Sequence, residues 1–200
     1  MPVPARDGSW VVDGWAASRF EPGTRQLTDL AATRAVGAVL HAELARVVSS
    51  WPPAQEPPVG RWAEAERVAF GERPLPDDGL APEVQGLLAR LAAARDDTDL
   101  GPAQLVHGDL AGNILLDPRG APVVVDLAPY WRPALWAEAT AVLDCVVGGH
   151  ADPLVMHEWS AGPHGQAMLR AAIFRVVSDH PVDLPAYEAA LAPLLARIRP

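Results

Sequence analysis

The sequence contains no lysine, and all 16 of its basic residues are arginine. A mechanism that depends on a lysine side chain therefore cannot be completed within this chain. Cys145 is the only cysteine, which excludes an intrachain disulfide and is typical of a reducing compartment. No apolar run reaches the roughly 18 residues that a membrane-spanning helix needs, and the first residues lack the apolar core of a signal peptide. We therefore expect a cytoplasmic protein with no membrane partner.

The composition is globular and the charge is acidic. Hydrophobic residues make up 50% of the chain and charged residues 20%, which is not the balance of a disordered protein. The formal net charge of -9 argues against a nucleic-acid partner, because proteins that bind nucleic acids usually present a basic face. The same charge would suit a cationic small molecule.

Helical periodicity dominates most of the chain. Apolar residues recur at helical spacing from Leu27 to Val48, and Thr28 is the predicted N-cap. The proline-rich stretch from Ser49 to Gly60 and the stretch 74–79 are predicted loops. Further helices are predicted over residues 61–70, 82–94, 133–147, 165–179 and 185–198.

Two parts of the sequence have an extended rather than a helical residue pattern. An extended segment is predicted at 104–107, and the segments 114–116 and 123–125 flank the turn signal Asp117-Pro118-Arg119-Gly120, which predicts a β-hairpin. At the start of the chain, Pro2–Ala5 and Ser9–Asp13 flank a turn at 6–8 and predict a two-stranded edge. The order of elements predicts an α+β fold with a helical majority.

Polar residues gather at the two ends of the predicted hairpin. Asp109 and Asn113 lie on the loop that enters it, and Asp126 follows the strand that leaves it. Because a hairpin brings its ends together, we expect these three side chains to converge. Carboxylate and amide oxygens suit Mg²⁺, and a free carboxylate nearby can orient a hydroxyl nucleophile. The pattern therefore predicts phosphoryl transfer, whose catalysis is mostly positioning and charge neutralisation.

These residues carry a resemblance to a known family. His107-Gly108-Asp109, together with Asn113 and Asp126, resembles the catalytic and metal-binding loops of aminoglycoside phosphotransferases, which share the protein-kinase-like fold. The resemblance implies Asp109 as the catalytic base or hydroxyl orienter, and Asn113 and Asp126 as Mg²⁺ ligands. It also implies ATP as the phosphoryl donor and a hydroxyl of a small molecule as the acceptor, with His107 supporting the site.

The resemblance further implies a role for Asp144 and a division of the chain. A buried carboxylate in an apolar helix can brace the catalytic loop near His107, whereas a partly exposed Asp144 would need no partner. Residues 24–200 would form the mostly helical C-terminal lobe of a kinase-like protein. Residues 1–23 would be the remnant of the N-terminal lobe and its hinge.

The sequence departs from the kinase-like pattern in two respects. Three residues rather than four separate Asp109 from Asn113, and Gly112 is the residue that would let this shorter loop turn. The lysine and the Gly-rich phosphate loop of the N-terminal lobe are also lacking. A misplaced start codon, a genuine fragment and a noncatalytic relative would each account for this. We favour an incomplete chain, because its leading strands would otherwise expose Val3, Trp10 and Val12.

Three hypotheses about function follow. The first is a phosphotransferase that uses ATP and Mg²⁺ on a small-molecule hydroxyl. The second is a noncatalytic, pseudokinase-like module that binds a nucleotide or a partner. A metal-dependent hydrolase based on His107 and Asp109 is the weakest of the three hypotheses, since no second ligand cluster accompanies them.

Trp51 and Trp62, beside the proline-rich loop, are candidates for lining a substrate cleft.

Overall fold

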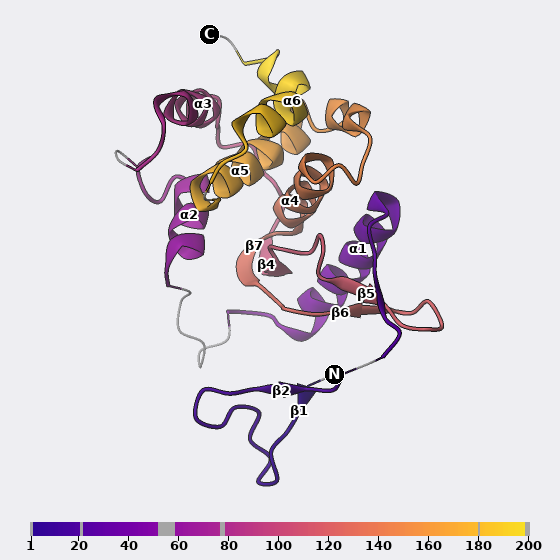
Figure 1. The fold of residues 1–200 in the computed structure, drawn as a ribbon. Helices are drawn as coiled ribbons and strands as arrows, with labels where there is room; N and C mark the ends of the chain where they lie inside the picture. Colours follow the sequence, from indigo (N-terminus) through magenta and orange to yellow (C-terminus); the bar gives the residue numbers. More distant parts are fainter. Residues whose placement is uncertain (1, 21, 52–58, 77–78, 180, 199–200) are drawn as a thin grey trace.

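The computed structural model describes residues 2–20, 22–51, 59–76, 79–179 and 181–198. These residues form a mixed α+β fold, in which a helical body stands on small antiparallel sheets (Figure 1). The helices are α1 Leu30–Val47, α2 Arg61–Ala69, α3 Pro82–Ala93, α4 Ala134–Val147, the 3₁₀ helix η1 Pro153–His157, α5 Gly162–Ser178 and α6 Leu184–Leu195. The strands are β1 Pro2–Val3, β2 Ala17–Ser18, β3 Arg25–Gln26, β4 Ala103–His107, β5 Ile114–Leu116, β6 Pro122–Val124 and β7 Pro129–Pro133. In this described part, no helix has both the length and the apolar character needed to cross a membrane.

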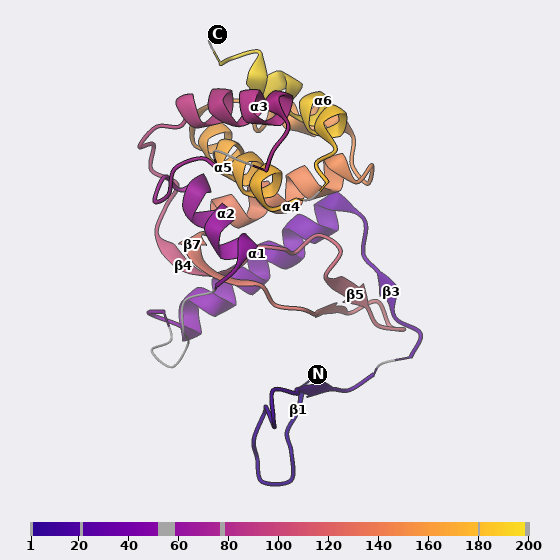
Figure 2. The same ribbon diagram turned by 60° about the vertical axis from the view of Figure 1, so that its left-hand side comes forward.

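Helices α4 and α5 form the centre of the body and pack against each other (Figure 2). The apolar residues all round α4 predict a buried helix, and the structure confirms this. Trp136, Trp159 and Phe174 are at most 1% exposed, and the rings of Trp136 and Phe174 meet edge to face at 5.4 Å. Burying an aromatic side chain of this size stabilises the fold by up to about 3 kcal/mol. The contact between Trp136 on α4 and Phe174 on α5 therefore helps to fix these two helices against each other.

The helix starts follow from local chemistry. Asp29 caps α1, because its Oδ1 accepts the N–H of Ala32 at 2.7 Å. The predicted cap, Thr28, is wrong for a simple reason: the N–H of Leu27 donates to the Ile114 carbonyl at 2.9 Å, so the chain is still extended there. The other predicted helices are present, with ends shifted by up to a few residues. Those parts of the predicted loops that span 52–58 and 77–78 lie outside the described residues.

Two small sheets bring the predicted site together. Strands β5 and β6 form the expected antiparallel hairpin, with Ile114 opposite Val124, and β3 adds to its free edge. Strand β4 pairs with β7, so His107 lies opposite Pro129. No strand is predicted from the sequence at β7, whose two end residues are prolines. A two-stranded sheet tolerates prolines at such positions, where a missing N–H breaks no central ladder.

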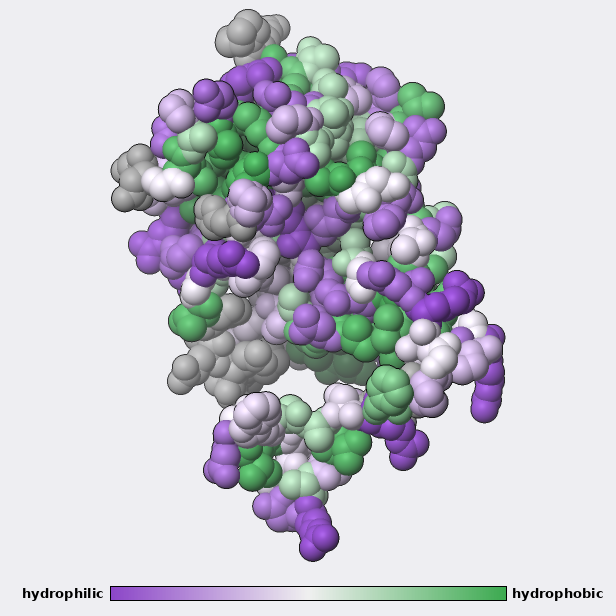
Figure 3. Space-filling view, viewed as in Figure 1, coloured by the Kyte–Doolittle hydropathy of each residue, from purple (hydrophilic) through white to green (hydrophobic). Residues whose placement is uncertain are grey.

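Residues 2–20 form a separate hairpin-like segment that projects from the body (Figures 1 and 3). Strand β1 pairs with β2, whereas the sequence predicts its partner at Ser9–Asp13. The prediction overlooked a second tight turn: Asp13 and Gly14 both have positive φ, and the N–H groups and carbonyls of Val12 and Trp15 bond across them. The segment leaves large apolar side chains exposed, among them the expected ones; they are Val3, Trp10, Val11, Val12, Trp15 and Phe20.

Candidate active site

The loop that carries Asp109 begins where β4 ends. The N–H of Gly108 donates to the Ala128 carbonyl at 2.9 Å, which ties the loop to the chain entering β7. A Cβ atom at Gly108 would lie 2.5 Å from a ring carbon of Tyr130, so glycine is required here by close approach. The residue before Asp109 is thus packed directly against Tyr130.

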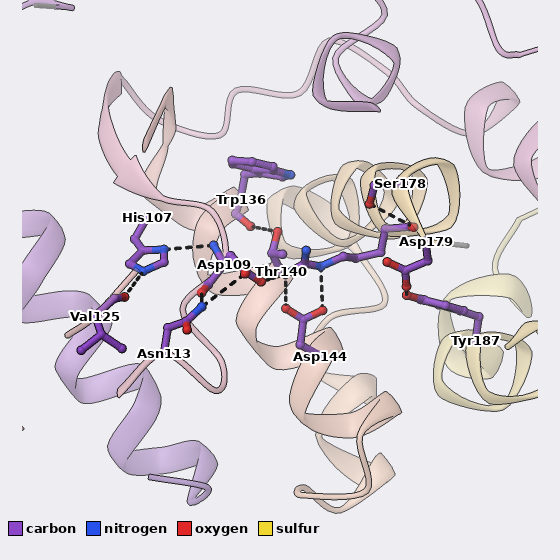
Figure 4. Close-up of polar contacts among 11 residues, drawn as sticks. His107, Asp109, Asn113, Val125, Trp136, Thr140, Asp144, Ser178, Asp179 and Tyr187 are labelled. Carbon is purple, nitrogen blue, oxygen red and sulfur yellow. Dashed lines mark hydrogen bonds and ion pairs between the residues drawn. The ribbon is translucent and has the colours of Figure 1, made fainter. Parts of the chain in front are cut away.

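Asp109 and Asn113 contact each other across the loop (Figure 4). The side-chain amide of Asn113 donates to the Asp109 carbonyl at 2.7 Å and to Asp109 Oδ2 at 3.2 Å. Gly112, with φ 85°, makes the left-handed turn that closes the shorter loop. With the nitrogen of the Asn113 amide engaged, its Oδ1 is available to a ligand, and no donor to it occurs among the described residues.

Asp126 stands at the exit of the hairpin in a strained conformation. Its φ of 48° lies in the left-handed region, which is uncommon outside glycine and best tolerated by Asn and Asp. The preceding residue, Val125, donates its N–H to the Asn113 carbonyl at 2.9 Å. Asp126 is exposed and takes part in no ion pair among the described residues. The hairpin backbone therefore places Asn113 and Asp126 at the same end, where Asn113 also contacts Asp109.

His107 is fully buried behind this end of the hairpin. Its Nδ1 accepts the N–H of Asp109 at 3.1 Å, so the ring proton lies on Nε2, which faces the Val125 carbonyl at 3.4 Å. Burial lowers the pKa of His107, although the Val125 carbonyl and the nearby carboxylates of Asp109 and Asp126 act in the opposite direction. A neutral ring with both nitrogens engaged is suited to hold the loop.

Arg175, which the sequence analysis did not single out, contacts Asp109 from α5. Its Nη2 donates to Asp109 Oδ1 at 2.6 Å, and its Nε donates to Asp144 Oδ1 at 2.8 Å. Asp144 was expected to brace the backbone near His107; its partner is instead the Arg175 side chain, which makes a second contact to Asp144 Oδ2. The brace therefore runs from Asp144 through Arg175 to Asp109.

Asp109, Arg175 and Asp144 form a clamp, of which the Arg175 and Asp144 side chains are largely removed from solvent. The Arg175 side chain is 6% exposed and that of Asp144 is 20% exposed. Burial would lower the pKa of Arg175, but the charges of Asp144 and Asp109 outweigh it and raise that pKa. Burial raises the pKa of Asp144 while Arg175 opposes the change. One signal was present in the sequence: a lone arginine in the apolar run Ala171-Ala-Ile-Phe-Arg-Val-Val implies a buried partner.

A hollow of about 280 Å³ lies beside Tyr130, which forms part of its wall. Trp51 and Trp131 meet edge to face across 6.4 Å at this hollow, and Glu66 and Glu72 line it. Arg132 pairs with both glutamates. Trp62, the second candidate for a cleft, lies beside the clamp, with Arg175 6.0 Å from its ring. Of the two tryptophans that the sequence analysis grouped, Trp51 lines this hollow.

The few oxygen ligands at the hairpin end suit Mg²⁺, which needs few protein ligands, better than a metal ion that is coordinated mainly by protein side chains. No cluster of three or more His, Cys, Asp or Glu side chains occurs in the described ranges. Asn113 Oδ1 and the exposed Asp126 carboxylate offer two hard ligands instead. Mg²⁺ commonly keeps several waters and uses one or two carboxylates together with substrate phosphates. The donor set is therefore compatible with a metal-nucleotide complex.

Comparison with known proteins gives one match. The model of the phosphotransferase enzyme family matches residues 4–130, which is more than half of the chain. The matched range includes Asp109, Asn113 and Asp126, whereas Asp144 and Arg175 lie beyond it. No match was found among curated proteins or among solved structures.

Proposed function

The chain belongs to the phosphotransferase enzyme family, and from that premise we propose a phosphotransferase of the aminoglycoside-phosphotransferase-like type that uses Mg²⁺ and ATP. The proposed acceptor is a hydroxyl group of a small molecule. One observation carries the proposal: Asn113 contacts Asp109, and its carbonyl accepts the N–H of Val125, the residue next to Asp126. The two aspartates and the asparagine are the residue types that phosphoryl transfer needs for positioning and for charge neutralisation.

Asp109 would orient the acceptor hydroxyl and accept its proton during transfer. Arg175 holds one carboxylate oxygen at 2.6 Å, and Asn113 holds the other at 3.2 Å. Because a carboxylate can accept about four hydrogen bonds, both oxygens retain capacity for a hydroxyl donor. The side chain is 43% exposed, which leaves an acceptor access to it. Fixed orientation of this kind is a main source of rate in such reactions.

Asn113 and Asp126 would hold the Mg²⁺ ion. When bound with ATP, the ion would neutralise charge on the transferred phosphoryl group. His107 would act as a positioning residue, because its ring bonds the Asp109 N–H and faces the Val125 carbonyl. The loop and the hairpin exit would then keep a fixed separation.

The hollow beside Tyr130 is the proposed acceptor side. Tyr130 both lines this hollow and packs against Gly108, so an acceptor there would be next to the Asp109 loop. Its three aromatic rings, from Trp51, Tyr130 and Trp131, and the net charge of -9 favour a cationic acceptor.

A noncatalytic module that binds a nucleotide or a partner is the second candidate. The absence of lysine favours it, since kinase-like enzymes hold the ATP phosphates with a strand lysine and a Gly-rich loop. Without them, the phosphates would be held only through the metal at one end. We therefore expect little or no kinase activity from this chain by itself. Robust ATP turnover that Asp109→Asn abolishes would contradict that expectation.

Paramagnetic broadening by Mn²⁺ with ADP tests the proposed metal-nucleotide site even if binding is weak. In the ¹⁵N-labelled chain, the backbone amides of Asn113 and Asp126 should broaden when both are added. Asp126→Ala should remove most of this effect, and Asp109→Ala should spare it, because Asp109 serves the hydroxyl. Asp97→Ala, at an exposed carboxylate elsewhere, is the matched control.

Two outcomes of this titration would count against the proposal. Equal broadening in Asp126→Ala and Asp97→Ala would mean that Asp126 holds no metal. Equal losses in Asp109→Ala and Asp126→Ala would mean that the division of roles is wrong.

A further inference from the structure

A second cavity, of about 390 Å³, lies between α1 and α4, behind the loop that carries Asp109. Figure 2 shows α1 crossing beneath α4, and the cavity opens between the two helices. Its walls are mainly small or apolar. They include Gly37, Ala38, Leu110, Leu135, Ala137 and Ala141. None of the functions considered so far uses this space.

His41 provides the polar part of the cavity wall. Its side chain belongs to a residue that is 4% exposed, and its Nε2 accepts the backbone N–H of His107 at 3.2 Å. Burial, followed by the proximity of His107, lowers the pKa of His41 to about 4, so the ring is neutral at pH 7. A neutral ring that accepts through Nε2 must carry its proton on Nδ1. His41 therefore presents one N–H donor from Nδ1.

This donor has no acceptor among the residues that the structure describes. Among the described residues, the only side-chain nitrogen or oxygen atoms that have neither solvent access nor a hydrogen-bond partner are the indole nitrogens of Trp136 and Trp159. His41 Nδ1 is not one of these atoms. Nδ1 of His41 is therefore not sealed, and the open space that His41 lines is the cavity. Because Nδ1 faces this open space without a partner among the described residues, an acceptor atom that enters the cavity can bond it.

The remaining polar groups define what could bind. Gln104 donates its amide to the His41 carbonyl at 2.8 Å, which leaves its Oε1 as a further acceptor at the wall. Arg34 and Glu138 at the rim are 2.7 Å apart and neutralise each other. The cavity thus offers mainly apolar walls, the N–H of His41 and no unpaired charge among its described side chains. These features suit a small uncharged molecule with one hydrogen-bond acceptor.

The cavity also contacts the loop that carries Asp109. His41 holds the loop through the His107 N–H, and α1 approaches it so closely that a Cβ on Gly37 would lie 2.8 Å from Leu110 Cδ2. We propose that the α1–α4 cavity binds a small, largely apolar, uncharged ligand whose acceptor atom bonds His41 Nδ1–H, and that occupation adjusts the loop through His41 and Leu110. Binding itself does not depend on the phosphotransferase activity.

A pair of probes of nearly the same shape tests the proposal. Acetophenone carries a carbonyl where α-methylstyrene carries a methylene, so only acetophenone can accept a hydrogen bond from His41. In the ¹⁵N-labelled full chain, acetophenone should shift the His107 amide and the His41 Nδ1–H in a saturable way. It should bind about five- to tenfold more tightly than α-methylstyrene, as one hydrogen bond warrants. Equal affinities, or no saturable shift of the His107 amide, would overturn the proposal.

Two variants locate the binding. Ala38→Phe fills the cavity at an exposed helix position and should abolish binding of both probes. His41→Met removes the donor and should make the two probes equal. Undiminished binding to Ala38→Phe would place the ligand elsewhere and refute the assignment. Should His41→Met fail to fold, the Ala38→Phe result and the probe pair on the unaltered chain still decide.

Discussion

The two sides of Asp109 are built in different ways. Toward α5, its Oδ1 meets Arg175, whose side chain is 6% exposed and is also bound to Asp144. Toward the hairpin, Asp109 meets the uncharged amide of Asn113, and Asp126 beyond it is exposed. One side is a buried network of charges. The other is an open array of oxygen atoms.

This difference separates positioning from binding. A buried charge cannot be left unpaired without a large penalty, so the α5 side fixes Asp109 in one orientation. The hairpin side has few internal partners and keeps its oxygens for ligands. The residues that build the buried side lie beyond the range 4–130 that the family model matches. Asp109 is therefore fixed by residues of α4 and α5, which lie outside the matched range.

The largest expected effect is at the buried side. Arg175→Met leaves Asp144 without its partner in the interior, and we expect it to lower the free energy of unfolding by about 3–5 kcal/mol. Arg34 is a matched control, because it too pairs with two carboxylates, Glu138 and Glu158, but is 29% exposed. Arg34→Met should cost about 0–1 kcal/mol. Urea denaturation of both variants measures the difference, and equal losses would mean that burial does not distinguish the two clusters.

An effect of intermediate size is expected at His41, which supports the same loop from α1. Its pKa falls from 6.5 to about 4 on folding, so the unfolded chain binds a proton that the folded chain does not bind between these values. The free energy of unfolding is therefore unaffected by His41 titration above about pH 6.5, and it decreases as the pH falls from 6.5 toward 4. The two pKa values correspond to a loss of about 3 kcal/mol.

Denaturation at several pH values with a matched variant isolates this contribution. His41→Gln keeps an acceptor for the His107 N–H but removes the titrating ring, so its stability should fall less between pH 6.5 and 4. His157→Gln, at an exposed histidine, controls for loss of a histidine. A wild-type chain and His41→Gln with parallel pH profiles would show that His41 titrates equally in both states.

Sequence patterns predicted the helices and strands that are determined by residues close together in the sequence. Helices α3 and α4 were predicted closely because apolar periodicity and a nearby proline mark their starts. The hairpin was predicted because its turn residues follow directly between two β-rich runs. Strands β3 and β7 were missed because they depend on partners distant in sequence. Arg25 pairs with Leu116, and Pro133 pairs with Ala103.

The same division applies to the site. Asp109, Asn113 and Asp126 could be grouped from sequence because one hairpin connects them. Arg175 could not be assigned to them, since 66 residues separate it from Asp109 and only the packing of α5 brings it there. His41 was likewise unassigned, because its contact to His107 spans the same sequence distance. Spacing along the chain identifies the open side of the site, and tertiary packing alone creates the buried side.

The smallest expected effect is at the open side, at Asp126. With φ at 48°, any residue with a Cβ is strained there, by about 1 kcal/mol, whereas glycine is not. Asp126→Gly should therefore be more stable than Asp126→Ala by about 1 kcal/mol, although both lose the carboxylate and the Mn²⁺-dependent broadening. Because both variants lose the carboxylate, the difference between their free energies of unfolding reports the backbone strain at this position.

Asp13, with φ 51° in the projecting N-terminal segment, sharpens this test. The same Gly-against-Ala comparison there should change global stability less, because that segment leaves its large apolar side chains exposed and buries little. A difference at Asp126 that is no larger than the difference at Asp13 would mean that the hairpin exit is not held rigidly. Asp126 would then have no structural reason to keep a strained conformation, and its role as a preformed metal ligand would lose its support. A larger difference at Asp126 would mean that the fold maintains this strain where a ligand is expected to bind.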